Sequence, residues 1–455
     1  MNAVKSLPFG MKTGCAILAV LLAACSSPQA KAFPGPPDVN EPWYMTFESE
    51  FELPDEMSDD APFLLEGYDR LSPDSDNAKW EYRYGPRRDA YSVEDNVFVT
   101  ELEDQSSTAL VLRTSKDTVQ SDEFSNPMRT GFIRTRNYEN TGPNDEMLFS
   151  QRYGYFEARM SLSSAPGQWG AFWLMPFHAT WCADSSGRDG TEIDIVEGYP
   201  IKPRKNYKRN KSIHFAIHYD GYRAFHKKII QPFPDGDQKR KFRHFDTSNF
   251  HTYGLLWTPD KYVWYVDGHP VFTIDDPDHI SQVPKFLKLS TEVAPWSGKL
   301  DPKLLPADTI VDWVRVWQTD TLAAGNPYIF EAEDAGRVNR SEAVYTKKMT
   351  AGTWCRGVFA KAKVNETGSV NIPIDAPVRV QEIGVRVSNP HDRSSSLSIY
   401  VDGELKETWP AIDLDPIFIL KHKLDAEISD QIEIVWDGKL AVDQVYLIPE
   451  QPTYR

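Results

Sequence analysis

Residues 190–198 have the sequence Gly-Thr-Glu-Ile-Asp-Ile-Val-Glu-Gly, in which acidic and apolar side chains alternate. Successive side chains of a β-strand point to opposite faces, so Glu192 and Asp194 are expected on one face and the isoleucines between them on the core side. Glu197 has the wrong parity to join the acidic face. A β-bulge at residues 195–196 would add one residue and return Glu197 to that face. The pattern therefore predicts a bulged strand with three carboxylates on one side.

Three carboxylates on one face of a strand have two interpretations. The strand can lie at the edge of a sheet with its acidic face in water, because isolated buried charges are costly. Alternatively, the face belongs to a retaining glycosidase, which needs a carboxylate nucleophile and a protonated carboxylic acid about 5–5.5 Å apart. An Asp194 hydrogen-bonded to either neighbouring Glu would keep one carboxyl group protonated and the other ionised.

The sequence on both sides of this stretch is also typical of β-strands. Short alternating or β-branched runs, such as residues 155–160 and 262–268, are separated by turn-forming Gly, Pro, Asn and Asp. No helical periodicity persists beyond about ten residues. We therefore expect an all-β protein with a sandwich over residues 42–317, a linker at 318–327 and a second, smaller C-terminal β-sandwich at 328–449.

The composition of the chain argues against some classes of binding partner. The 455 residues include 50 Lys and Arg against 66 Asp and Glu, a net charge of −16, which argues against a nucleic acid as partner. Aromatic residues make up 12% of the chain, which suits either sugar stacking or an aromatic β-sheet core. Residues 201–250 depart from this balance with 13 Lys and Arg against 4 Asp and Glu. This basic stretch is either a solvated loop or a contact surface for a sulfated or uronic-acid-bearing glycan.

The N-terminus carries the features of a secretory signal. Residues 1–24 contain two lysines followed by an apolar run that is too short to cross a bilayer. The run ends in Leu-Ala-Ala-Cys, which resembles a bacterial lipobox with Cys25 as the lipidated residue. We expect a lipoprotein of the bacterial cell envelope, at the outer membrane, attached through Cys25 and a Ser/Pro-rich tether at residues 25–41. Plain secretion is the alternative.

The acidic stretch and its surroundings resemble a known enzyme family. Glu-Ile-Asp-Ile-Val-Glu at residues 192–197 is similar to the signature of glycoside hydrolase family 16, in the bulged form with two residues between the Asp and the second Glu. Further segments that look like strands of this family lie, in order, at residues 153–160, 167–176, 250–260, 265–268 and 311–317. The resemblance covers residues 43–317 and falls in the laminarinase- and agarase-like branch.

This resemblance implies a concanavalin-like β-jelly-roll sandwich whose concave sheet forms an open cleft. It assigns Glu192 as the nucleophile, Asp194 as the assisting residue and Glu197 as the acid/base of a retaining endo-β-glycanase. Such an enzyme hydrolyses internal β-glycosidic bonds of a β-1,3-glucan or β-galactan by double displacement, and a sulfated or acidic algal galactan is the alternative substrate. A non-catalytic glycan-binding surface lipoprotein is the alternative function.

Aromatic and histidine residues near this strand are candidates for sugar binding. Trp169 and Trp173 share a parity, and both have core packing as their alternative role. Trp296 lies among turn residues and resembles a cleft-edge Trp of laminarinase-like relatives. His218 lies where relatives place a subsite His, and it shares a parity with His214. A structural role is the alternative for both histidines, and it is favoured more for His214.

Both ends of the C-terminal unit resemble carbohydrate-binding module family 6. Such modules often hold calcium at these ends, which would place Glu331, Glu333 and Asp443 around a structural calcium ion. The glycine- and asparagine-containing ligand loop of that family has no match here, so a spacer without a sugar ligand is the alternative. We expect no cofactor for catalysis, a polysaccharide as the partner, and a monomer.

Overall fold

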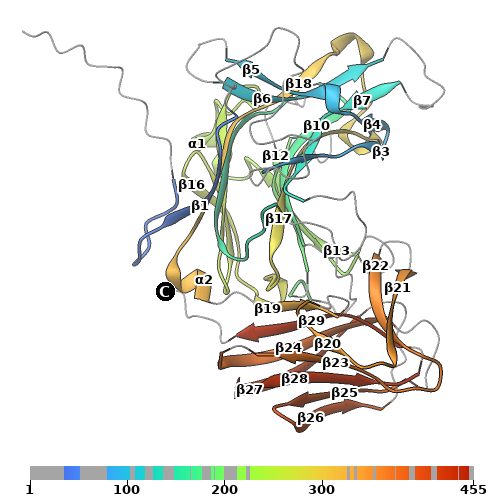
Figure 1. The fold of residues 1–455 in the computed structure, drawn as a ribbon. Coiled ribbons are helices and arrows are strands. Elements are labelled where there is room, and N and C mark those ends of the chain that lie inside the picture. Colours follow the sequence, from blue (N-terminus) through green and yellow to red (C-terminus); the bar gives the residue numbers. More distant parts are fainter. Residues whose placement is uncertain are drawn as a thin grey trace, which may run out of the picture. The chain divides into compact units, whose positions relative to one another are not determined.

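The computed structural model is an all-β protein, in agreement with the sequence prediction, and the described residues include only two short α-helices, α1 (Gln238–Lys241) and α2 (Asp320–Ala324) (Figure 1). None of the described helices is long and apolar enough to cross a membrane. The structure describes residues 35–51, 79–102, 108–117, 127–136, 148–163, 165–176, 186–188, 190–198, 213–221, 226–324, 328–332, 336–351, 355–374, 376–388, 395–410, 418–438 and 440–449. The predicted signal and Cys25 lie outside these residues, so the lipid anchor stays a prediction.

Strands between Tyr44 and Gln318 build two large sheets. The larger sheet contains β1 (Tyr44–Ser49), β3 (Gly85–Arg87), β4 (Ala90–Ser92), β5 (Val97–Glu101), β6 (Thr108–Lys116), β7 (Met128–Thr130), β9 (Gly154–Ser161), β14 (His251–Trp257), β15 (Tyr262–Val266), β16 (His269–Ile274) and β18 (Ala307–Gln318). Its order is β16-β15-β14-β9-β18-β6-β7-β4-β3, with β1 also beside β18 and β5 beside β6.

The second large sheet carries the acidic strand. It contains β2 (Glu81–Tyr82), β8 (Phe132–Arg134), β10 (Gln168–Pro176), β11 (Glu192–Glu197), β12 (Ile213–Tyr219), β13 (Lys227–Phe233) and β17 (Lys285–Val293). The order β13-β12-β11-β10-β17-β8-β2 places β11 in the interior of the sheet. The alternative interpretation of a solvated edge strand is therefore wrong, because β11 has a hydrogen-bonded neighbour on each side.

The apolar faces of these two sheets pack together in one core. Phe156 of β9 and Trp264 of β15 share this core with Phe172 of β10 and Ile193 of β11, and all four side chains are buried. Trp264 also donates a hydrogen bond from its indole Nε1 to the backbone oxygen of Asp194, at 3.1 Å. This bond connects the acidic strand to the opposite sheet.

The strands from Tyr328 to Pro449 form two further sheets with a core of their own. The first contains β19 (Tyr328–Glu331), β21 (Val344–Ala351), β22 (Cys355–Ala362), β24 (Val378–Ser388), β27 (Phe418–Ile428) and β29 (Ala441–Pro449). The second contains β20 (Asn339–Arg340), β23 (Gly368–Pro373), β25 (Leu397–Val401), β26 (Glu404–Trp409) and β28 (Gln431–Trp436). This unit is thus a smaller two-sheet β-structure.

Candidate active site

Strand β11 has the bulge that its sequence predicts. Its partners on β12 are Ala216 for Asp194 and His214 for Glu197, so three steps along β11 match two along β12. The pairing of β11 with β10 skips Ile195 as well. Ile195 is therefore the extra residue, and its side chain is buried in the core. The bulge changes the parity of the residues after it and turns Glu197 to the acidic face.

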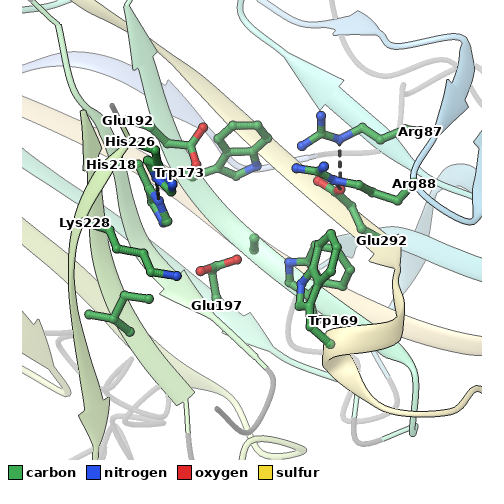
Figure 2. A pocket seen from close by; sticks show the side chains of 13 residues that line it. Arg87, Arg88, Trp169, Trp173, Glu192, Glu197, His218, His226, Lys228 and Glu292 are labelled. Atoms are coloured by element: carbon green, nitrogen blue, oxygen red, sulfur yellow. Dashed lines mark hydrogen bonds and ion pairs between the residues drawn. The ribbon is translucent and has the colours of Figure 1, made fainter. Parts of the chain in front are cut away.

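The bulge brings Glu192 and Glu197 into one cleft, which has a volume of about 480 Å³. Figure 2 shows both carboxylates directed into this cleft. Asp194 lies between them along β11 and has only 3% of its surface exposed. One oxygen each of Glu192 and Asp194 and a ring nitrogen of His218 lie within 4.8 Å of one another. The structure thus brings together all three predicted carboxylates at one site.

The environment of Asp194 favours its protonated form. Burial raises the pKa of the Asp194 carboxyl well above its usual range, and the charges of Glu197 and Glu192 raise it further. His218 opposes this shift with its Nε2 at 3.4 Å from Asp194 Oδ2. The sequence predicts one protonated carboxyl group in this set. The structure favours Asp194 itself, because it is the most buried of the three.

His214 is the partner of Glu197. Its Nε2 lies 2.5 Å from Glu197 Oε2, and its ring is completely buried. Burial by itself raises the pKa of Glu197, but the charge and hydrogen bond of His214, together with His218 and Trp169, outweigh burial and lower the pKa. His214 therefore contacts a predicted catalytic group, whereas the sequence favoured a structural role for it.

His218 connects the carboxylates to a second histidine. Its Nδ1 lies 2.8 Å from Nε2 of His226, and the two rings are nearly parallel, with an angle of 12° between them. Burial lowers the pKa of His218, but its contact with Asp194 and the charges of Glu192 and Glu197 raise the pKa above its usual value, so Asp194 and His218 share a proton. Both histidines line the cleft, as predicted for His218 but not for His226.

Three tryptophans form an aromatic side of the cleft. Trp169 and Trp173 line it although each is only 4% exposed, so both are packed side chains that border the cleft. Their part in sugar binding stays a prediction. Trp296 is 47% exposed, and its ring centroid lies 5.5 Å from that of Trp169. Lys288 lies with its Nζ 3.6 Å from the ring centroid of Trp173, and burial lowers the pKa of this lysine well below its usual range.

Charged residues that the sequence did not single out complete the cleft wall. Arg87, Arg88 and Glu292 line it, and so does Lys228 of the basic stretch (Figure 2). Within that stretch, basic residues gather at 202–211 and at 239–243. The cluster at residues 239–243 lies on α1 and the turn after it, outside the lining of this cleft. The cluster at residues 202–211 lies outside the described residues.

The predicted calcium ligands of the C-terminal unit are only partly described. Asp443 is almost fully buried, and its Oδ2 lies 2.7 Å from Nη1 of Arg386. Because a guanidinium neutralises this carboxylate, Asp443 fits an ion pair better than a calcium site. Glu333 and the side chain of Glu331 lie outside the described residues. The calcium ion and the resemblance to carbohydrate-binding module family 6 stay predictions.

Comparisons with known proteins give a matching family model and several similar proteins. The family model described as Glycosyl hydrolases family 16 matches residues 95–315. Endo-1,3-1,4-beta-glycanase EglC of Rhizobium meliloti (strain 1021) is 28% identical over 176 residues, which are 38% of this chain and 32% of that protein. Keratan-sulfate endo-1,4-beta-galactosidase of Sphingobacterium multivorum is 25% identical over 261 residues, which are 55% of this chain and 54% of that protein. This chain thus spans about a third and about half of the two relatives.

A similar solved structure is the catalytic domain of an endo-1,3-beta-glucanase (laminarinase) from Thermotoga petrophila RKU-1. It is 19% identical with a TM-score of 0.42, and the likeness covers 62% of this chain and 99% of that chain. The residues that match the family model include β11, its bulge and the three carboxylates. Residues 95–315 of this chain are therefore similar to glycosyl hydrolases family 16.

Proposed function

We propose that this part of the chain is a retaining endo-β-glycanase, which cuts internal bonds of a β-1,3-glucan or β-galactan. The observation that carries the proposal is the bulge at Ile195, because it places Glu192 and Glu197 in one cleft with Asp194 between them. Two carboxyl groups that face one bound sugar supply the acid and the nucleophile of glycoside hydrolysis. The aromatic side of the cleft suits the apolar faces of sugar rings.

In the first step, the Glu192 carboxylate attacks the anomeric carbon while Glu197 gives its proton to the glycosidic oxygen. The bond between the anomeric carbon and that oxygen breaks, one part of the polysaccharide leaves with the proton, and the other part stays esterified to Glu192. In the second step, Glu197 takes a proton from water, and the water oxygen attacks the anomeric carbon and releases Glu192. Two inversions at one carbon retain its configuration.

Asp194 lets the nucleophile stay ionised in a partly buried cluster. Three adjacent carboxylates would repel one another. A negative charge costs most on Asp194, because Asp194 is the most deeply buried of the three. A proton on Asp194 removes one of the three negative charges. Glu192 then keeps its charge for the attack on the anomeric carbon.

Replacing His214 by Phe is expected to move the basic limb of the kcat/KM profile to higher pH. His214 lowers the pKa of Glu197, so its removal leaves burial to raise that pKa. The acid form of Glu197 then persists to higher pH, and a shift of about 1–2 pH units is expected. His214→Gln keeps a hydrogen-bonding side chain without the charge and should shift the limb less. An unchanged limb in a folded His214→Phe variant would contradict the role given to this pair.

The proposal as a whole is tested with the purified chain on laminarin, mixed-linkage glucan, agar, carrageenan and arabinogalactan. Long oligosaccharides are expected as the first products on chromatography, because an internal cut precedes shortening of the fragments. On a short oligosaccharide, proton NMR should show the β-anomer of the new reducing end before mutarotation. Release of monosaccharides only, or of the α-anomer first, would show a different reaction.

A further inference from the structure

The β3–β4 hairpin places two consecutive arginines at the cleft. Strands β3 and β4 pair with each other, and Asp89 in the turn donates its backbone N–H to the oxygen of Val293 at the end of β17, at 3.0 Å. Arg88 adopts a left-handed conformation with φ of 56°, which is costly for a residue with a side chain. The hairpin, residues 85–92, lies outside the part of the chain that matches the family model.

A single buried carboxylate faces both guanidinium groups. Glu292 is 3% exposed, and its Oε2 lies 2.9 Å from Nε of Arg87 and 4.0 Å from Nε of Arg88. The two guanidinium groups thus share the Glu292 carboxylate. Ser290 joins it to the aromatic side, because its Oγ accepts from Trp173 Nε1 at 3.1 Å and donates to Glu292 at 3.3 Å.

Each arginine also lies against a tryptophan of the cleft. The guanidinium carbon of Arg87 is 5.3 Å from the ring centroid of Trp173, and that of Arg88 is 5.0 Å from the ring centroid of Trp296. Stacking against a ring fixes the plane of a guanidinium and leaves its N–H edge available for polar contacts. The side chain of Arg88 keeps 44% of its surface exposed, so its N–H groups are accessible from the cleft.

We propose that Arg88, supported by Arg87 and Glu292, determines specificity by binding an anionic substituent, a sulfate ester or a carboxylate, on a sugar bound beside Trp296. This inference rests on the proposed function and narrows its substrate class. The planar fork of an arginine matches two oxygens of such a group, whereas a neutral glucan carries no charge for the guanidinium to bind. Figure 2 shows both arginines on the side of the cleft opposite Lys228, with Glu197 between the two sides.

Binding to three forms of one polysaccharide tests the proposal. The probes are laminarin, laminarin sulfate and carboxymethyl laminarin, measured by affinity electrophoresis in a Glu192→Gln background so that the polymers stay intact. Arg88→Gln is expected to weaken binding of at least one charged probe by about tenfold and to change binding of laminarin by less than about twofold. The difference between the sulfate and carboxymethyl probes identifies the preferred substituent, and raised salt should reduce the loss.

Two further variants test whether the effect depends on the position of Arg88 and on the shape of its guanidinium group. Arg240→Gln removes the same charge from exposed helix α1, away from the cleft lining, and should leave all three affinities unchanged. Arg88→Lys keeps the charge without the planar fork and should give an intermediate affinity. Equal losses on laminarin and on the charged probes would overturn the proposal, since Arg88 would then only position Trp296. Hydrolysis of polysaccharides by the unmodified chain is measured separately. If that hydrolysis occurs but Arg88 shows no preference for anionic probes, the proposal for Arg88 fails and the proposed hydrolase function stands.

Discussion

Replacing Glu192 by Ala is expected to lower kcat on polysaccharides by at least about 1,000-fold, because the covalent intermediate forms on this carboxylate. Glycan binding should persist, since the tryptophans and the basic wall of the cleft stay in place. Rates are compared by reducing-end assays and binding by affinity electrophoresis. Glu101→Ala, at an exposed position at the end of β5, is the control variant and should retain full activity.

Azide shows which step Glu192 performs. In the Glu192→Ala variant, a small anion can enter the space left by the carboxylate and attack the anomeric carbon of an aryl β-glycoside. The expected product is the α-glycosyl azide, formed by a single inversion, and its configuration is read by NMR. A β-glycosyl azide from this variant would instead assign Glu192 to proton transfer.

Replacing Glu197 by Ala is expected to lower kcat on polysaccharides by about 100- to 10,000-fold, the usual contribution of general acid–base catalysis. The loss in the first step should be small for a 2,4-dinitrophenyl glycoside, because this leaving group departs without a proton. Azide should then accelerate turnover and give the β-glycosyl azide, since Glu192 still forms the intermediate. These rates are followed by absorbance of the released dinitrophenolate.

The same variant reports on the His214 pair. Without Glu197, the basic limb of the pH profile should disappear, because no acid remains to lose its proton. An equal loss on the polysaccharide and on the dinitrophenyl substrate would contradict the acid role, as would a basic limb that persists unchanged.

The all-β fold and the bulge follow from local patterns in the sequence. Alternating residues in β11 set the two faces of the strand, and the wrong parity of Glu197 requires one extra residue before it. Parity also predicts that Trp169 and Trp173 share a face, as both line the cleft. The two faces of a single strand can be predicted in this way, because the face to which a side chain points depends only on its neighbours in the chain.

Contacts between strands were harder to predict. His214 lies opposite Glu197 only because of the register between β11 and β12, which the bulge shifts. Arg87 and Arg88 reach the cleft because β4 pairs with β7 and because the hairpin is bonded to the end of β17. Register and strand order depend on the packing of the whole sandwich, so no spacing in the sequence signals these residues.

The hydrogen bond from Trp264 to the backbone of Asp194 joins β11 to a side chain in the core between the two large sheets. Amide hydrogens of β11 should therefore exchange with solvent only when the whole domain unfolds. Laboratory evolution toward new sugars would then succeed more readily in the 85–92 hairpin and around Trp296. Those positions lie outside β11 and its two neighbouring strands, β10 and β12.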